Sequence, residues 1–420
     1  MKVVVLGAGI IGTTTAYYLA KLGYQVTVVE ARPGPGEETS FANGALLAAG
    51  QTEPWNTPGI GWKIAKWIGK EDSPMLLRPT KLPQYVGWGL EFLKHSRPEP
   101  HERGRRGNVA LGMETVRELR RIRDEEGIDY DHTSRGILRV FRDADGIEAR
   151  KKMNADVADL GVTCQALDPA EAVDYEPALG SLKDEIAGAL LYDEDESGDC
   201  HKFCVGLTQV CRELGVAFQF DTRITGIDAK GEKIAGVETD KGRFEGDLYV
   251  LALGLGSVAL ARTLGIKLPI MPVKGYSVTL ARDRSNTPLS TPVIDADLLT
   301  CTVPLQGRIR MAGTAEFAGE DRKMDETRAG NVLNRGLGAF PEMRRSMQQD
   351  DVTYWTGLRP VTPDGRPIVG DSPYANLYLN TGHGPSGWTL SCATSKAVAA
   401  LIDGRRPEVE VGELHHTRFH

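Results

Sequence analysis

The chain has 420 residues, of which 41% are hydrophobic and 25% charged, a globular composition that argues against disorder. Its formal net charge of −7 gives no basic field for nucleic acid, and no apolar run is long enough to span a bilayer. The length exceeds what one hydrophobic core usually supports, so we expect two domains.

A dinucleotide-binding fingerprint lies at the start of the chain. Because the first apolar run leads directly into its glycines, we do not interpret that run as a signal peptide. Residues 2–6 predict a buried parallel strand, 13–23 a helix, and 24–30 a second strand ending in an acid. The three glycines between strand and helix fit a tight turn, a close approach to pyrophosphate and close helix–strand packing, and the acid fits the adenosine ribose. The expected contacts are Gly7, Gly9, Ile10, Ile11, Gly12, Glu30, Ala31 and Arg32.

A loop rich in glycine, proline and serine follows over residues 31–50. No second fingerprint appears that would hold NAD beside FAD. Because long irregular loops are uncommon unless functional, we expect this one to line the pyrophosphate and the flavin edge through Thr39, Ser40, Asn43 and Gly44. A plain surface loop is the alternative.

The middle of the chain alternates between helical and strand patterns. Helices are predicted over 108–127, 145–160 and 205–214. Strands are predicted over 136–141 and 247–257, and hairpin strands over 216–229 and 233–242. Residues 268–317 form a further set of strands. We include Ile224 and Gly254 among the expected cofactor contacts.

A second strand–loop–helix unit lies near the C-terminus, over 376–401. Its loop N–H groups and positive helix end are expected to face the flavin and stabilise the anionic reduced ring. An ordinary structural turn is the alternative. The contacts expected here are Gly382, His383, Gly384, Gly387, Trp388 and Thr389.

This order of elements predicts an α/β fold with two domains. A discontinuous Rossmann-like FAD-binding domain is expected from residues 1–85, 195–258 and 351–420. A mixed α+β substrate domain with an antiparallel sheet is expected from residues 86–194 and 259–350.

Stretches along nearly the whole chain together resemble one family: VVVLGAGIIG, ETSFANG, PWNTPG, WKIAKW, DESGDCHKF, PVKGYS, WTGLRPVTPDG and NTGHGPSGWT. They resemble FAD-dependent oxidoreductases of the D-amino-acid oxidase/glycine oxidase superfamily, and most of all the bacterial D-amino acid dehydrogenases. The resemblance implies oxidation of a D-amino acid to an imine, released as a 2-oxo acid and ammonia. It also implies that reduced FAD passes electrons to a quinone or dye-type respiratory acceptor.

Three residues are the candidates for contact with the reacting groups. Arg359 in GLRP suits a substrate carboxylate, because its fork of donors pairs bidentately, and the resemblance places it there. Tyr276 in PVKGYS is a second expected contact, with ordinary packing as the alternative, and Lys274 shares its face of the strand. His383 is expected beside the flavin without an acid–base role, since a hydride can pass directly from the substrate Cα to flavin N5 when the amine is neutral.

Three functions remain open at this stage. A D-amino acid dehydrogenase leads, followed by a glycine, sarcosine or cyclic imino-acid (D-proline or D-hydroxyproline) oxidase or dehydrogenase. A non-catalytic flavoprotein is disfavoured by Arg359, because a scaffold has no use for a carboxylate clamp. The preferred side chain, and oxygen against quinone as acceptor, cannot be read from the sequence.

The six cysteines have no zinc-like spacing and are expected to be free thiols. The cysteine-free span between Cys301 and Cys392 contains GLRP, so we expect non-covalent FAD. No metal site is expected, and the histidine-rich tail over 414–420 is interpreted as a frayed terminus.

The segment GIGWKIAKWIGK (59–70) is basic, carries Trp62 and Trp67, and lacks acids. Such a stretch can lie in a membrane interface, while a helix packed over the substrate entrance with its tryptophans in the core is the alternative. We expect a cytoplasmic enzyme with peripheral contact at the inner face of the cytoplasmic membrane.

Overall fold

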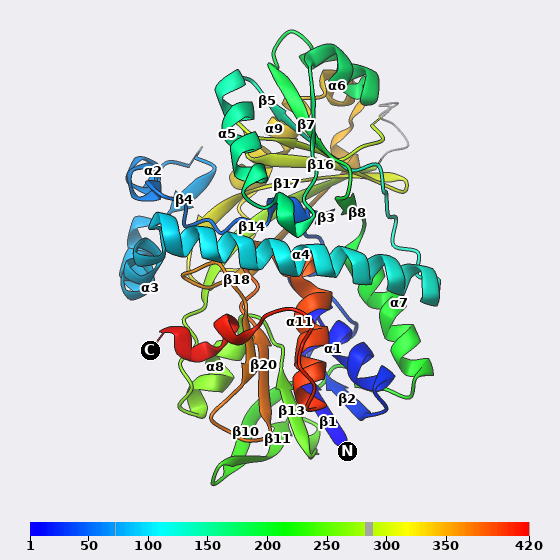
Figure 1. The fold of residues 1–420 in the computed structure, drawn as a ribbon, viewed down its shortest axis with the longest axis vertical. Helices are drawn as coiled ribbons and strands as arrows, with labels where there is room; N and C mark the ends of the chain where they lie inside the picture. The colour runs from blue at the N-terminus through cyan, green and yellow to red at the C-terminus, as the bar shows by residue number, and fades with distance from the viewer. Residues whose placement is uncertain (72, 282–288, 420) are drawn as a thin grey trace.

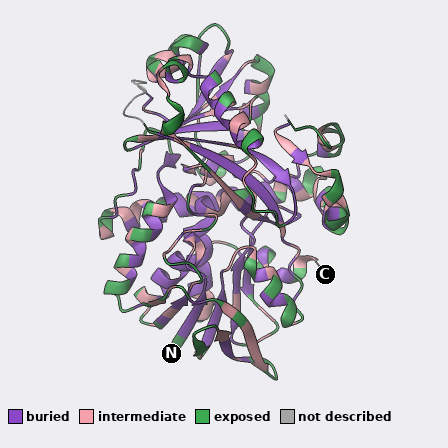
Figure 2. Cartoon of the chain, turned by 180° about the vertical axis from the view of Figure 1, so that it is seen from behind, coloured by how far each residue is buried: buried purple, intermediate pink, exposed green. Residues whose placement is uncertain are grey.

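The computed structural model describes residues 1–71, 73–281 and 289–419, and it contains two large sheets with helices between and around them (Figure 1). The expected α/β fold class is confirmed. Buried residues concentrate along both sheets, and exposed residues lie on the outer helices (Figure 2).

The six-stranded sheet has the order β19-β20-β13-β1-β2-β9. Its strands are parallel except for β19, which pairs antiparallel with β20. The first strand is apolar and buried on both faces, as expected for a strand covered by helices on both sides. The strands are β1 (Lys2–Leu6), β2 (Gln25–Val29), β9 (Ala217–Gln219), β13 (Leu248–Leu251), β19 (Ile368–Asp371) and β20 (Leu377–Thr381).

The second sheet has the order β18-β14-β17-β16-β15-β5-β7-β6, with β4 paired to β17. Most of its neighbours are antiparallel. Its strands are β4 (Met75–Leu77), β5 (Ile137–Phe141), β6 (Gln165–Leu167), β7 (Gly188–Tyr192), β14 (Met271–Ala281), β15 (Val293–Asp295), β16 (Thr300–Leu305), β17 (Arg308–Phe317) and β18 (Val352–Val361).

Small polar residues allow the two central helices of the nucleotide half to pack closely. These helices are α1 (Ile10–Lys21) and α11 (Gly387–Ile402). The Thr14 hydroxyl lies 2.8 Å from the Ser395 hydroxyl, and Thr14 also donates to the carbonyl of its own helix at Ile10. Both buried hydroxyls therefore have a hydrogen-bond partner, so the two helices pack closely without leaving these polar groups unsatisfied.

The remaining elements surround these layers, and α4 crosses the molecule between the two sheets (Figure 1). The helices are α2 (Ile60–Trp67), α3 (Leu82–His95), α4 (Pro98–Glu126), α5 (Ala144–Ala155), α6 (Pro169–Tyr175), α7 (Cys200–Glu213), α8 (Gly256–Thr263), α9 (Glu326–Gly338) and α10 (Pro341–Ser346). The small strands are β3 (Leu46–Leu47), β8 (Glu196–Ser197), β10 (Ile224–Lys230), β11 (Lys233–Thr239) and β12 (Gly242–Phe244).

Two strands pair outside the segments expected for them. β4 and β18 belong by sequence position to the predicted nucleotide domain, but both pair with strands of the second sheet. Long-range pairing, which local sequence does not specify, decides their place. The domain boundaries as a whole remain a prediction.

The tail is not frayed where it is described. Leu414 is fully buried, and Arg418 pairs with the Asp364 carboxylate at 2.8 Å, so the tail is anchored to the domain. His420 lies outside the described residues. No cluster of metal-ligating side chains occurs within residues 1–71, 73–281 and 289–419.

Candidate active site

A cavity of about 830 Å³ lies between the two sheets. One end is lined by the β1–α1 turn, including Gly7 and Gly9, and the other by Gly275 and Arg359 of the second sheet. This volume falls within the range of roughly 300–1,000 Å³ that is usual for ligand sites. The cavity thus joins the predicted cofactor and substrate elements.

The glycines of the first turn allow two close backbone approaches. Gly7 has φ +104°, in a region that favours glycine. A Cβ on Gly12 would lie 1.9 Å from the Gly7 carbonyl oxygen, so Gly12 permits the packing of α1 against the turn. Gly12 does not line the cavity itself, which assigns it the packing role expected for the third glycine.

The Glu30 carboxylate is fixed at the nucleotide end of the cavity. Its oxygens accept backbone N–H bonds from Ala8 and Arg32, both at 2.8 Å. Burial raises the pKa of Glu30, and these N–H bonds oppose the rise. Because two bonds leave acceptor capacity free, the carboxylate suits ribose hydroxyls.

The loop over 39–44 connects the turn to the second sheet. The Ser40 hydroxyl accepts the Ile10 N–H at 3.1 Å, and the Thr39 hydroxyl donates to the Leu358 carbonyl at 3.0 Å. Ser277 donates to the backbone of the same loop at 2.6 Å. The loop is therefore an ordered wall of the cavity rather than a free surface loop.

The residues present fit FAD, on the evidence of the glycine turn, the fixed acid and the two helices whose N-termini meet at one cavity. Most predicted residues line it: Gly7, Gly9, Ile10, Ile11, Glu30, Ala31, Arg32, Thr39, Ser40, Asn43, Gly44, Gly254, Tyr276, Arg359, His383, Gly384, Gly387 and Trp388. Two helix N-termini are suited to hold the anionic pyrophosphate and the flavin edge.

Three further predicted contacts do not line the cavity. Ile224, the first residue of β10, is partly buried against an apolar cluster, and its neighbour Arg223 lines the cavity instead. Gly382 lies against Thr362 and Ile270, and the Thr389 hydroxyl donates to a backbone carbonyl on β3. These residues pack outside the residues that line the cavity.

The Arg359 guanidinium lies in the substrate half of the cavity, and the residue is half-buried. Its Nη1 donates to the Thr314 carbonyl at 3.0 Å, and its Cζ lies 5.6 Å from the centre of the Trp55 ring. No carboxylate of the described residues pairs with it. Desolvation lowers its pKa to about 10, so Arg359 stays charged at neutral pH.

The structure does not bring the Tyr276 hydroxyl to Arg359. It donates to Glu316 at 2.5 Å, and the ring packs in the core of the second sheet. Since side chains alternate along a strand, the neighbouring residues Gly275 and Ser277 lie on the opposite face of β14, and both line the cavity. The position of the hydroxyl therefore agrees with the packing alternative, and a contact between Tyr276 and the substrate remains a prediction.

Lys274 shares the Tyr276 face, as predicted, with its Nζ 5.6 Å from that ring's centre. It is almost fully buried and pairs with Asp321 at 3.1 Å. Lys274 does not line the cavity.

His383 lines the cavity, and its Nε2 lies 3.0 Å from the Thr394 hydroxyl. Burial lowers its pKa to about 3, so the ring is neutral at physiological pH. A base this weak, already held in a hydrogen bond, is unsuited to take a proton from an ammonium group. This agrees with an orienting rather than an acid–base role.

Sequence reasoning missed several cavity residues of the second sheet. Trp355, Ala312 and Cys301 line the cavity and follow one another across neighbouring strands with Ser277 between the first two. Trp355 lies in the same motif as Arg359, four positions earlier, which is a signal the sequence does contain. Cys301 has none, because only strand register brings it here.

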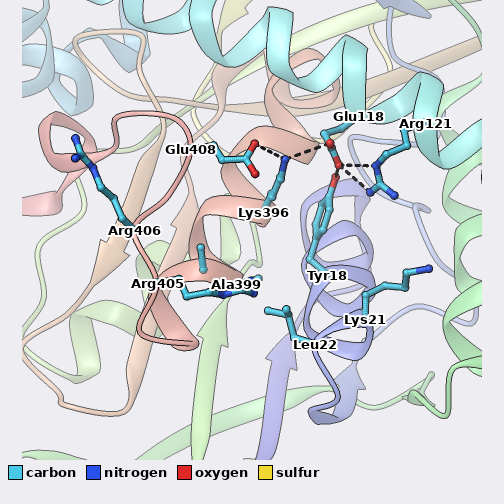
Figure 3. Close-up of a pocket in the computed structure, with 11 residues that line it drawn as sticks. Tyr18, Lys21, Leu22, Glu118, Arg121, Lys396, Ala399, Arg405, Arg406 and Glu408 are labelled. Atoms are coloured by element: carbon cyan, nitrogen blue, oxygen red, sulfur yellow. Dashed lines mark hydrogen bonds and ion pairs between the residues drawn. The ribbon is translucent and has the colours of Figure 1, made fainter.

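A second, smaller cavity lies on the outer surface between α1, α4 and the end of α11 (Figure 3). Lys396 is held there between Glu118 and Glu408, at 3.2 and 2.6 Å. Tyr18 and Arg121 also bond Glu118. Because these charges already compensate one another, we assign no ligand to this cavity.

The chain is similar to several known proteins along its whole length. A family model described as FAD dependent oxidoreductase (DAO) matches residues 2–401. The chain is 39% identical over 420 residues to a D-amino acid dehydrogenase of Bradyrhizobium diazoefficiens. It is 40% identical over 420 residues to another of Paramagnetospirillum magneticum. Each alignment covers 100% of this chain and 99% of the relative.

Solved structures show the same fold. L-proline dehydrogenase from P. horikoshii has a TM-score of 0.78 at 20% identity, with 100% of this chain and 97% of that one covered. Glycine oxidase from Geobacillus kaustophilus has a TM-score of 0.77 at 22% identity, with 99% and 98% covered. At these identities the likeness concerns the fold alone.

Proposed function

Because this chain belongs to the FAD-dependent oxidoreductase family, we propose that it is a D-amino acid dehydrogenase. The substrate is oxidised at its Cα–N bond to an imine, which water converts to a 2-oxo acid and ammonia. The observation that carries this proposal is Arg359, a half-buried guanidinium that lines the cavity and has no carboxylate partner among the described residues.

The proposal explains why the chain keeps a poorly solvated positive charge in this cavity. Isolating a charge from water is costly unless an opposite charge accompanies it. The carboxylate of an amino acid supplies the missing charge, and the Arg359 donors not bound to the Thr314 carbonyl supply its hydrogen bonds. The clamp thereby fixes the carboxylate and orients Cα.

The cofactor would be held by the β1–α1 turn and Glu30 at one end, and by the start of α11 at the other. FAD, when bound, supplies the two-electron acceptor for the substrate hydride. His383 is neutral and provides no base, so the reactive substrate carries a neutral amine. The chain's task is then orientation and exclusion of water.

The test is a turnover scan with a dye acceptor over D- and L-amino acids, glycine, sarcosine and D-proline derivatives. We expect oxidation of D-amino acids with release of one 2-oxo acid and one ammonia. Turnover confined to glycine, sarcosine or cyclic imino acids would favour the second function considered above. Turnover of none, in protein that contains FAD, would contradict an enzyme.

For the electron acceptor, we infer a quinone reached at a membrane surface through α2 and α3. Trp62 on α2 is 81% exposed, and Val86 and Leu90 on α3 are 60% and 65% exposed. Lys66 and Lys70, which follow Trp62 in the same segment, are exposed as well. Exposed apolar groups with neighbouring lysines suit an anionic lipid surface. No helix of the described residues is long and apolar enough to cross a bilayer.

The two tryptophans of α2 differ in a way that sharpens the test. Trp67 packs against an apolar cluster with Tyr85 and Trp88, so it supports the core alternative, whereas Trp62 is free. Trp62→Glu should therefore reduce sedimentation with anionic liposomes at low salt without changing dye-linked activity. Val205→Glu, at an exposed apolar position on α7, is the control. Absence of wild-type binding at any salt would contradict membrane contact.

A further inference from the structure

Thr314 on β17 has an unusual backbone directly behind the carboxylate clamp. Its φ of +57° lies in the left-handed region, which β-branched residues rarely adopt. The pairing of β14 with β17 is irregular at the same place, between Lys274 and Tyr276. Such bulges redirect a backbone group, and here the Thr314 carbonyl accepts the Arg359 Nη1 at 3.0 Å.

The Thr314 side chain is held from the other side. Its hydroxyl donates to the Pro74 carbonyl at 3.0 Å and accepts a hydrogen bond from Arg328. Both the carbonyl and the hydroxyl are thus in use. The residue links Arg359 to the segment before β4.

Arg328 on α9 secures this arrangement. It is 1% exposed and donates to the carbonyls of Ser73 at 2.8 Å and Ala315 at 3.3 Å. Ala315 follows Thr314 in the bulge, and Ser73 precedes Pro74, whose carbonyl the Thr314 hydroxyl binds. Arg328 therefore joins the bulge to the segment before β4. A buried guanidinium with several fixed acceptors is a rigid brace.

We propose that Thr314 and Arg328 are positioning residues for Arg359. This proposal rests on the proposed function. A carbonyl held at one Nη fixes the direction of the guanidinium plane and leaves its other donors for the substrate carboxylate. Strained backbone retained at a ligand site is typical of such preorganisation. Neither residue needs to touch the substrate.

The test uses propanoate, the amine-free analogue of alanine, titrated into the holoenzyme and followed by the flavin absorbance. Thr314→Val, which lacks the hydroxyl at similar size, should raise the Kd for propanoate and the KM for D-alanine about tenfold. The rate constant for flavin reduction at saturating D-alanine should change less than the KM. Thr314→Ser should restore both values.

Thr314→Gly separates positioning from stability. Glycine tolerates φ +57°, so this variant should unfold at a higher temperature than Thr314→Val and still bind propanoate about tenfold more weakly than wild type. Arg328→Lys should weaken binding in the same direction. Thr302→Val on β16, a buried threonine between Val293 and Met311 of the neighbouring strands, is the control and should bind normally.

Two results would overturn the proposal: normal propanoate binding by Thr314→Gly, or weakened binding by Thr302→Val of the same size. Failure of the wild type to bind propanoate and oxidise D-alanine would instead contradict the proposed function. The two failures are therefore distinguishable.

Discussion

Replacing Arg359 tests the substrate clamp, because activity and stability should change in opposite directions. The guanidinium has one backbone anchor, at 3.0 Å from Thr314, and one aromatic neighbour, Trp55. Its remaining donors can form a bidentate pair worth about 2–5 kcal/mol in charge-assisted bonding. Arg359→Ala should therefore lower kcat/KM for a D-amino acid by about 10² or more, with the FAD content unchanged.

In the protein without substrate, Arg359 should lower the free energy of unfolding. The lowering of the Arg359 pKa to about 10 by desolvation corresponds to on the order of 3 kcal/mol against the charged form. Arg359→Met, which keeps the chain length without the charge, should therefore raise the free energy of unfolding by about 1–3 kcal/mol. Arg359→Lys keeps the charge but not the planar fork, and should also lose kcat/KM.

The assay combines dye-linked kinetics with denaturant unfolding in the absence of substrate, and the exposed Arg406→Ala is the matched control. Near-normal kcat/KM for the alanine variant would remove Arg359 from the substrate site. A large loss of stability in Arg359→Met would show that the arginine is a structural brace, and would refute the reasoning from its missing partner.

Three further predictions use other parts of the cavity. A Cβ on Gly275 would lie 2.4 Å from the Arg359 Cζ, so Gly275→Ala should weaken propanoate binding about tenfold, whereas Gly330→Ala, with open space around it, should not. Because the pKa of His383 is lowered to about 3, the unfolded chain binds its proton first as the pH falls below about 6.5. Its contribution to stability is therefore lost between about pH 6.5 and 3, at about 1.4 kcal/mol per pH unit, and unfolding of His383→Asn should lack this slope; equal slopes would contradict the burial argument. Acid precipitation should release the yellow flavin into the supernatant, because burial raises the pKa of Cys301 to about 11 and keeps its thiol protonated; a yellow pellet would indicate covalent FAD.

The parts of the site that sequence could predict are those with local signals. The glycine turn, Glu30 and the start of α11 follow from strand–loop–helix patterns that occupy a few consecutive residues. Arg359 could be found because a buried-looking arginine stands before a proline in a recognisable motif. All of these lie at the cavity, and FAD dependence agrees with the family.

The errors come from long-range pairing. The alternation along β14 correctly placed Lys274 and Tyr276 on one face, but only the pairing with β17 and β18 shows that this face is the core and that Gly275 faces the cavity. The same pairing brings Cys301 to the site. No pattern within a single strand contains that information.

Exposure was the other quantity that the sequence left open. The basic segment over 59–70 allowed both a membrane-facing and a core-packed interpretation. In the structure, Trp62 is exposed and Trp67 packs against an apolar cluster, although both lie on one short helix. The apolar stripe on α3 was not predicted as exposed, since its spacing equally suits burial.

Anaerobic mixing of the holoenzyme with enantiomers tests the central claim most directly. D-alanine should bleach the flavin absorbance at about 450 nm by reducing bound FAD, and L-alanine at the same concentration should not. Added propanoate should slow the bleaching competitively, as expected if both carboxylates bind Arg359. Bleaching by L-alanine alone, or by neither enantiomer nor any other D-amino acid, would contradict a D-amino acid dehydrogenase built around this clamp.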